Sequence, residues 1–373
     1  MINRFFSIFK SIKDGEWFYI FPEEFFGDIP DYERRKFADL RQVYLGYKNS
    51  GIAEEQIEEY MKVFGDALEK NLTPLEKLYH IKCYTSVHNK RYFGEKNKKL
   101  RVCRFCGKSF PAVSFTDLAH SIPLAIGNHI FYNNYECDTC NHFCGEVIEP
   151  HLINWLGCML LFSQTSGRNG IPKLLFEKGL MEYDKENNVI VIVQKKNDIF
   201  FNDTLDDEAM TPLIQLGEGT GYIPAFVYRA LVKIAIGFFP EQYMGKFKNT
   251  INWLLDVTKI KKLPKIAYSI SQIPCNNPQP EIALYIRKGD EFSNLPFAVA
   301  SVTMCGLRVV YVIPFVDGDK CDFISDEGYQ LYWNTFSIYS NAPVQWTFED
   351  LSKSIEVTSC LNIKFQQRDS NNE

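Results

Sequence analysis

Apolar residues recur at helical spacing in the N-terminal part of the chain. Between residues 50 and 71 the recurring positions are Ile52, Ile57, Tyr60, Met61, Phe64 and Leu68. This spacing predicts an amphipathic helix with one buried stripe. A capping box at Thr73–Glu76, with Pro74 at the first helical position, predicts a second helix that continues to about His88. We therefore expect residues 1–99 to form a mostly helical region.

The pattern of apolar positions changes in residues 166–373. The run NNVIVIVQ (187–194) follows a turn signal and predicts a strand. Pro224 opens a strongly apolar helix that Pro240 ends. Two further strand-like runs, at 281–287 and 297–315, precede a turn at Asp317–Gly318. We expect a mixed α/β domain, which would serve regulation, sensing or assembly.

Two cations, Arg229 and Lys233, lie four residues apart on the apolar helix that Pro224 opens. Such a pair could reach a phosphate group. The commoner arrangement is that the aliphatic stems are buried while the charged ends extend to water. We interpret Arg229 and Lys233 in this second way.

The first 18 residues, MINRFFSIFKSIKDGEWF, contain an apolar stretch broken by Lys10 and Lys13. They lack a small-residue cleavage site and do not resemble a signal peptide. A packed helix is the favoured interpretation, and an amphipathic helix on a membrane surface is the alternative. Because no apolar run approaches the roughly 18 residues of a membrane span, we expect a cytoplasmic protein without membrane contact.

The distribution of charge and of cysteine points to one segment. The net charge is −5, which excludes a uniformly basic nucleic-acid-binding chain. Residues 88–108, however, hold eight Lys or Arg and one acid, Glu95. This run is either a solvated linker or a phosphate-binding segment. The candidate nucleic-acid-binding residues are Lys90, Arg91, Lys96, Lys98, Lys99, Arg101 and Arg104.

Two Cys-x-x-Cys pairs follow in a distinct module at 100–165. Cys103 and Cys106 form the first pair, and Cys137 and Cys140 form the second after thirty intervening residues. Each two-residue spacer can direct both thiolates at one ion, so the pairs predict a closed, structural zinc site with four cysteine ligands. With eleven cysteines and no secretory signal, metal-bound or plain buried thiols are favoured over disulfides. The apolar run after Pro150 predicts a helix that packs this module onto the rest of the chain.

The segment between the two cysteine pairs resembles the HNH branch of the ββα-metal nucleases. The motifs that carry the resemblance are Ala119-His120, Ile122-Pro123, Gly127-Asn128, Asn133-Asn134 and Asn141 directly after Cys140. They agree with the family in residue type, order and spacing over about residues 103–150. The resemblance implies an α+β fold in which a zinc-stabilised ββα-metal module lies between the helical N-terminal region and the mixed C-terminal domain.

The resemblance also implies roles for individual residues. His120 would be the general base for phosphodiester hydrolysis, because a neutral imidazole suits that task. Asn134 would orient the imidazole of His120, with Asn133 and then Asn128 as competitors. Asn141 would bind a catalytic Mg²⁺ or Mn²⁺ through its amide oxygen. His142 next to it is expected on the surface or facing DNA.

Ala119 stands where many HNH nucleases carry a carboxylate that binds the catalytic metal. Asp117 would lie on the same strand face about 7 Å away and could replace that carboxylate. Glu149, about 12 Å from Asn141 along a helix, is the second candidate ligand. Because HNH branches with an Ala-His motif and a distal Ile-Glu pair exist, we interpret Ala119 as a branch signature rather than a sign of an inactive site.

These features predict a metal-dependent endonuclease that hydrolyses DNA. Double-stranded DNA is the expected substrate, with RNA left open, and the resemblance suggests an effector of bacterial restriction or anti-phage defence. The regulators we expect are a second copy of the chain or a protein encoded beside it. Two alternatives stay open from the sequence: a zinc-stabilised nucleic-acid-binding protein without catalysis, and a nuclease of a mobile element.

Overall fold

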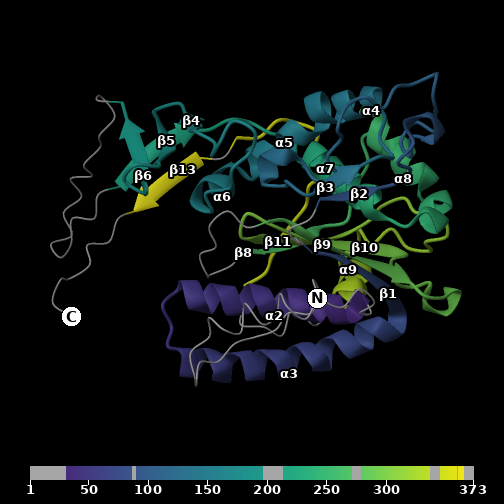
Figure 1. The fold of residues 1–373 in the computed structure, drawn as a ribbon, viewed down its shortest axis with the longest axis horizontal. Coiled ribbons are helices and arrows are strands. Elements are labelled where there is room, and N and C mark those ends of the chain that lie inside the picture. Colours follow the sequence, from purple (N-terminus) through teal and green to yellow (C-terminus); the bar gives the residue numbers. More distant parts are fainter. Residues whose placement is uncertain are drawn as a thin grey trace, which may run out of the picture.

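The computed structural model describes residues 31–85, 90–195, 213–270, 279–336, 345–358 and 360–364. The segment 1–18, where a packed or membrane-surface helix is expected, lies outside these residues. The described chain begins with two antiparallel helices, α2 (Asp31–Asn49) and α3 (Glu54–Leu78), which form one outer layer of the molecule (Figure 1). The amphipathic pattern over residues 52–68 therefore predicted a helix correctly.

The centre of the molecule is a six-stranded antiparallel sheet in the order β1-β9-β10-β11-β8-β12. Its strands are β1 (Tyr79–Tyr84), β8 (Ile266–Ile270), β9 (Glu281–Arg287), β10 (Ala298–Met304), β11 (Leu307–Val312) and β12 (Thr347–Glu349). The apolar runs at 281–287 and 297–315 form strands as predicted. They read as continuous apolar stretches because both faces of the sheet are covered.

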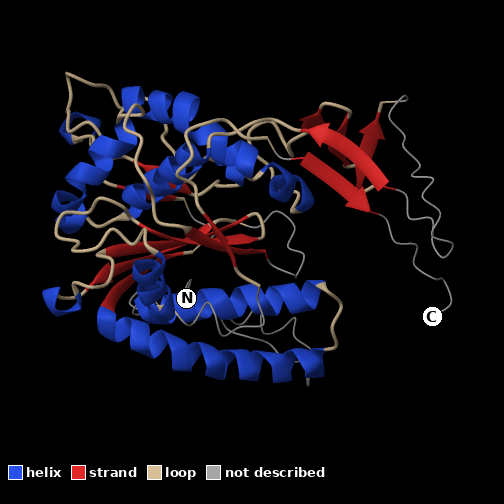
Figure 2. Cartoon of the chain, turned by 180° about the vertical axis from the view of Figure 1, so that it is seen from behind, coloured by secondary structure: helices blue, strands red, loops and turns tan. Residues whose placement is uncertain are grey.

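Each face of the sheet has its own core. Leu72 and Leu75 of α3 pack with Tyr285 and with helix α9 (Asp326–Thr335) on one face. The other face carries α7 (Pro224–Phe238), α8 (Lys248–Leu255) and the cysteine-rich module, and its core joins Ile282 to Leu231. Figure 2 shows the two long helices on one side of the sheet and most of the shorter helices on the other. Short 3-10 turns complete these layers at η5 (Glu241–Phe247) and η6 (Asp290–Phe292).

The helix expected from Pro74 to about His88 is not present. Instead α3 runs through Pro74 and ends at Leu78, where Tyr79 is already extended with φ −127° and ψ 143°. The segment YHIKCY then pairs with β9 as β1 and buries alternate residues, Tyr79, Ile81 and Cys83. The period-two alternation of apolar residues therefore outweighed the capping signal, because this segment gains a buried sheet face.

The cysteine-rich module lies against α7. Its elements are β2 (Arg91–Phe93), η2 (Lys98–Leu100), η3 (Leu124–Ile126), β3 (Phe131–Asn133), α4 (Asp138–Phe143), a turn of π-helix η4 (Cys144–Ile148), α5 (Glu149–Trp155) and α6 (Gly157–Phe162). The apolar run after Pro150 is helical, as predicted, and packs toward α7. Leu152 and Leu156 share the core that includes Leu231 of α7.

A smaller β region lies at the periphery, beside α6 (Figure 1). It contains the antiparallel strands β4 (Leu174–Phe176), β5 (Gly179–Asp184) and β6 (Val189–Gln194), and the antiparallel pair β7 (Leu213–Glu218) and β13 (Cys360–Lys364). The strand predicted at 187–194 is β6.

The structure is a mixed α+β fold, as the sequence predicts. In the sequence, strand β1 of the six-stranded sheet precedes the 100–165 module, and the other five strands follow it. The division into domains at 1–99, 100–165 and 166–373 stays a prediction of the sequence. Among the helices that the structure describes, none combines the length and apolarity needed to cross a membrane.

Candidate functional site

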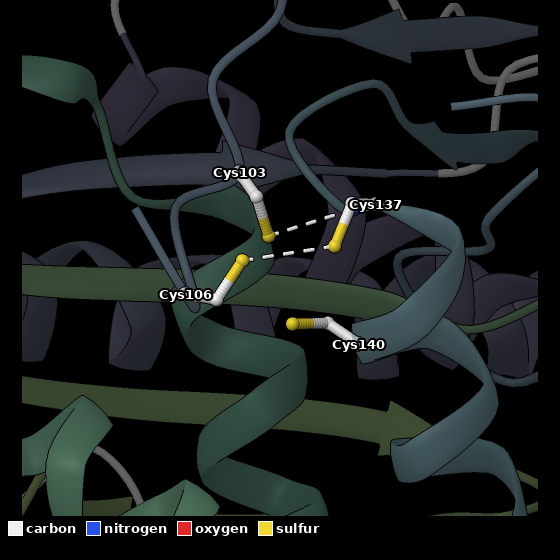
Figure 3. A group of neighbouring side chains, drawn as sticks. All are labelled: Cys103, Cys106, Cys137 and Cys140. Atoms are coloured by element: carbon white, nitrogen blue, oxygen red, sulfur yellow. Dashed lines mark hydrogen bonds between the residues drawn. The ribbon is translucent and has the colours of Figure 1, made fainter. Parts of the chain in front are cut away.

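The four paired cysteines converge on one point (Figure 3). The sulfur atoms of Cys103, Cys106, Cys137 and Cys140 all lie within 4.8 Å of one another. The Sγ atoms of Cys106 and Cys137 are 3.7 Å apart. A tetrahedral zinc ion with bonds of about 2.3 Å places its sulfur ligands about 3.8 Å apart. The cluster therefore has the size of a structural zinc site.

Local turns produce this arrangement. After the first pair, Gly107 adopts the left-handed φ of 71°, and its N–H donates to the carbonyl of Cys103 at 2.8 Å. The second pair lies at the start of α4, where the N–H of Asn141 donates to the carbonyl of Cys137 at 2.9 Å. Hydrogen bonding with Cys140 lowers the pKa of Cys103, whereas the same hydrogen bond raises the pKa of Cys140 and burial raises that of Cys137. Four cysteine sulfurs at this spacing are the ligand set of a closed structural zinc site. The donor set thus suits zinc.

The histidine between the pairs lies on a short β hairpin. His120 forms an antiparallel bridge with Tyr132 of β3, and the N–H of Asn133 donates to the carbonyl of Ala119 at 2.8 Å. The rings of His120 and Tyr132 lie on the same face, with centroids 4.9 Å apart. Because alternate residues share a face, Leu118 and Asn134 lie on this side too. Helix α4 follows this hairpin in the sequence.

A groove of about 310 Å³ runs along this face of the hairpin. Its lining residues are Tyr92, Lys96, Lys98, Arg101, Thr116, Asp117, Leu118 and Asn134. At the rim, Tyr92 stacks on Tyr132 with ring centroids 5.0 Å apart and an interplanar angle of 18°, and it is 48% exposed. Lys90 lies over Tyr132 at 5.6 Å from the ring centroid. The groove therefore offers cations and one aromatic face to a ligand.

The surroundings of His120 disfavour its charged form. Burial first, and then the charges of Lys233 and Arg168, lower the pKa of His120, while Glu149 acts in the opposite direction. Its Nδ1 atom is buried and has no hydrogen-bond partner among the described residues. A histidine with a purely structural role in a core is normally hydrogen-bonded, so this imidazole is unusual.

Lys233 does not extend to water, which corrects the interpretation of this residue as a snorkelling cation. Its side chain is 1% exposed, and its Nζ lies 3.1 Å from Oε2 of Glu136 and 2.9 Å from Oε1 of Glu149. It also donates to the carbonyl of His120 at 3.3 Å. Burial disfavours its charge, but the two carboxylates outweigh burial and raise the pKa of Lys233. Burial raises the pKa of Glu136 to about 7.

Arg229 is buried as well, so its charged end also differs from the snorkelling expectation. The guanidinium donates to the carbonyl oxygens of Trp253, Leu254 and Lys259, all outside the cysteine-rich module. It lies over the ring of Trp253 at 4.4 Å. The two terminal nitrogens of this cation therefore pair with the end of α8 and the loop after it rather than reach solvent.

The two carboxylates considered as metal ligands are both engaged. Oδ2 of Asp117 lies 2.7 Å from Nε2 of His142, on the exposed side of α4. Oε1 of Glu149 is paired with Lys233.

The loop before His120 is fixed by Asp138, whose carboxylate accepts from the N–H groups of Thr116 and Asp117, both at 3.0 Å. Burial opposes ionisation there, but hydrogen bonds from the side chains of Ser114 and Thr116, together with these two N–H groups, outweigh it and lower the pKa of Asp138.

The asparagines fall into different roles. The side-chain amide of Asn128 stabilises the turn. It donates to the carbonyls of Ile122 and Phe131 and accepts from the N–H of Phe131. Asn133 is buried and accepts from the N–H of Tyr135. Asn134 lines the groove, but it makes no hydrogen bond to Nδ1 of His120. The side chain of Asn141 is half-buried at the first turn of α4.

The basic residues divide between the groove and the interior. Lys90, Lys96, Lys98 and Lys99 are exposed, and Arg91 is half-buried. Arg101 is buried in the groove wall, where its Nε donates to the carbonyl of Glu95 at 2.8 Å. Arg104 corrects the expectation of a nucleic-acid contact, since its side chain is 3% exposed. It donates to the carbonyls of Ile236 and Phe239, because the C-terminal turn of α7 lacks partners of its own.

Four residues of the site were given no role there by the sequence analysis. Glu136 and Lys233 carried no motif, although a lysine within an apolar helix is a signal that a buried carboxylate is near. Asp138 lies inside the second cysteine pair, and its position at the start of a helix could have marked it as a capping residue. Tyr132, which contacts His120, alternates with Phe131 as an ordinary strand residue would.

Comparison with known families and proteins agrees with this geometry. A family model described as HNH endonuclease matches residues 103–156. Neither the search of curated proteins nor that of solved structures found a match to the chain. The matched segment contains the cysteine cluster, the hairpin with His120 and helix α4. Residues 103–156 are therefore an HNH endonuclease domain with a four-cysteine cluster.

Proposed function

We propose that the protein is a metal-dependent endonuclease that hydrolyses DNA phosphodiester bonds with His120 as the general base. The observation that carries this proposal is the state of His120 within an HNH domain. Burial and nearby cations lower its pKa, and Nδ1 has no partner among the described residues. A neutral imidazole that is not committed to a structural hydrogen bond is suited to act as a general base toward an attacking water.

The metal-binding part of the proposal rests on oxygen donors in α4 and in the loop whose Asp117 pairs with His142 of α4. Asn141 would offer its amide oxygen to Mg²⁺ or Mn²⁺, hard cations that prefer such ligands. When bound, the cation would stabilise the negative charge that develops on the phosphoryl oxygens. Asp117 is the carboxylate we propose beside it, because it lines the groove and its side chain is exposed. Glu149 is assigned instead to the pair with Lys233.

The groove supports nucleic acid as the substrate. Lys96 and Lys98 line it, and Lys90 and Lys99 are exposed near it, so that a phosphate backbone would meet several cations. Tyr92 presents a half-exposed ring at the rim, where a base or sugar could pack. We propose double-stranded DNA as the main substrate. The role we propose is that of an effector in restriction or anti-phage defence, regulated by the parts of the chain outside residues 103–156.

The alternative function is a zinc-stabilised nucleic-acid-binding protein without catalysis. The observation that favours it is Ala119, which provides no metal-binding group at the position where many HNH nucleases have a carboxylate. This alternative predicts retention of DNA on the protein without any strand breakage in the presence of a divalent cation.

A cleavage assay separates the two functions. Supercoiled plasmid, single-stranded DNA and RNA are each incubated with the full chain and with Mg²⁺, Mn²⁺ or no added divalent cation. We expect plasmid nicking and linearisation only with the cation, and loss of cleavage when EDTA is added at the start. Binding without cleavage of any substrate, with either cation and with the products of neighbouring genes added, would contradict the endonuclease function and support the alternative.

A further inference from the structure

One buried ammonium group joins three segments of the HNH domain to a helix outside it. Lys233 belongs to α7, far from residues 103–156 in the sequence. Its Nζ contacts the carbonyl of His120, Oε2 of Glu136 and Oε1 of Glu149. A lysine ammonium has three N–H donors, and here each has an oxygen to meet.

The three oxygens come from different parts of the site. His120 lies on the hairpin, Glu136 lies between β3 and the second cysteine pair, and Glu149 begins α5. Burying an ammonium and two carboxylates is unfavourable unless their geometry is good. An arrangement of this kind therefore fixes the distances between the segments, and the segment that carries the imidazole is one of them.

Helix α7 is itself held against the central sheet. The hydroxyl of Tyr228 donates to the carbonyl of Val312 at 2.8 Å, and the hydroxyl of Tyr311 donates to the carbonyl of Leu231 at 2.6 Å. Lys233, two residues beyond Leu231 on α7, thus connects the sheet layer to the backbone of His120.

We propose that Lys233 is a positioning residue of the nuclease site, which holds the backbone of His120 so that the imidazole meets the scissile phosphate in the productive orientation. This inference rests on the proposed endonuclease function and adds to it a contribution from a helix outside the HNH domain. Lys233 is too deeply buried to contact substrate, so it acts only through His120 and the two carboxylates. Misplacement of a reacting group by about 1 Å can cost about 100-fold in rate.

The chain offers a matched control for this role on the same helix. Arg229 lies one turn before Lys233, is buried as well and also donates to carbonyl oxygens. Its acceptors lie on α8 and the loop after it, and none belongs to the HNH domain. Removing either cation therefore leaves buried oxygens without their donor, but only removal of Lys233 affects the support of His120.

The test compares Lys233→Met and Arg229→Met in the full chain. Zinc content and thermal melting first establish that each protein is folded at the assay temperature. Plasmid cleavage then gives kcat, KM and the pH dependence of kcat/KM. For Lys233→Met we expect kcat to fall roughly 10- to 100-fold with KM within about threefold of wild type. For Arg229→Met we expect both constants to stay close to wild type.

The pH profile adds a readout that a loss of stability alone would not move. The charged and titratable groups that act on His120 are Lys233, Arg168, Glu149 and His129. Without the Lys233 charge, the remaining carboxylate Glu149 raises the pKa of His120 further. The acidic limb of kcat/KM is therefore expected at higher pH in Lys233→Met and at its original place in Arg229→Met.

The outcomes are separable from those of the proposed function. If the wild-type chain cleaves no nucleic acid, the endonuclease function fails. If it cleaves and a folded Lys233→Met keeps wild-type kcat and pH profile, the positioning role is overturned. If Lys233→Met does not fold, Lys233→Arg decides, because its charge is retained but its planar fork cannot reproduce the three contacts. A folded Lys233→Arg with wild-type kcat overturns the proposal, and a kcat at least about fivefold lower supports it.

Discussion

The cysteine cluster of the HNH domain and the surroundings of His120 depend on residues that lie at very different separations in the sequence. The cysteine cluster joins residues at most about a tenth of the chain apart, such as Cys103 and Cys137, which are separated by 34 positions. The support of His120 comes from Lys233, which lies 113 positions further along the chain. The metal-binding scaffold is therefore local, whereas the environment of the candidate base depends on how the rest of the chain packs against it.

This difference has a consequence for how the domain can vary. A local cysteine cluster can form wherever its two turns and the first turn of α4 form. The pKa and the position of His120 instead depend on α7, and through α7 on the central sheet. We expect substitutions of the four clustered cysteines to lower the stability of the fold. Substitutions around His120 should instead lower the cleavage rate.

The largest expected effect is that of removing a cysteine of the cluster. Cys140→Ala removes one of four ligands, and we expect loss of zinc and a fall in the free energy of unfolding of about 4 kcal/mol or more. Cys144→Ala is the control, because Cys144 is fully buried nearby but does not belong to the cluster. Zinc analysis and denaturant unfolding measure both variants. Equal zinc content in the two proteins would contradict a role of Cys140 as ligand.

The next effect concerns the catalytic cation. Asn141→Ala removes the proposed amide ligand, and we expect the Mg²⁺ concentration for half-maximal cleavage to rise at least about 10-fold. Asn141→Asp keeps an oxygen at the same place and should need less Mg²⁺ than Asn141→Ala. Mg²⁺ titrations of the cleavage rate provide the comparison. An unchanged Mg²⁺ requirement in Asn141→Ala would show that the cation binds elsewhere.

A smaller effect is expected in the groove. Lys96→Ala and Lys98→Ala should each weaken DNA binding and lower the slope of log K against log salt by about one if each side chain meets one phosphate. Lys70→Ala, an exposed lysine on α3 beyond the sheet, should change neither quantity. Binding titrations at several salt concentrations give the slopes. If all three variants show the wild-type slope, the groove is not the path of the backbone.

The smallest effect is a displacement on the pH axis. Because burial and neighbouring cations lower the pKa of His120 from 6.5, its basic form persists to lower pH than in a free histidine. Cleavage by this base is full above the lowered pKa and is lost as the pH falls through it. We expect the acidic limb of the pH profile of kcat/KM below pH 6.5. The imidazole of His120 is titrated in parallel by NMR, and its resonance is assigned by its loss in His120→Ala. A limb and a resonance that both titrate above 6.5 would contradict the electrostatic account.

The sequence was a good guide wherever the signal is local. The cysteine spacing, the apolar helix opened by Pro224 and the strand runs at 281–287 and 297–315 each depend on a few neighbouring residues. The exception is instructive, because Thr73 and Pro74 carry a capping signal and still lie inside α3. There the alternation in residues 79–84 and the pairing with β9 decided the outcome, and pairing with a strand about 200 residues away is invisible locally.

The environment of the site was harder to predict for the same reason. Lys233 and Arg229 look equivalent in the sequence, being two cations four residues apart on an apolar helix. One pairs with the HNH domain and the other with the end of α8. Arg104 likewise lies within the basic run, but its guanidinium donates to a carbonyl near the C-terminal end of α7. Such partners depend on tertiary packing, which residue type and spacing do not encode.

The rate of plasmid cleavage by His120→Ala, beside His80→Ala as the control, tests the central claim most directly. His80 is an exposed residue of β1 and lies outside the HNH domain. With equal zinc content and saturating Mg²⁺, we expect His120→Ala to cleave roughly 10²- to 10⁴-fold more slowly than wild type, and His80→Ala to match wild type. Cleavage by a folded, zinc-loaded His120→Ala at the wild-type rate would contradict the assignment of His120 as the general base.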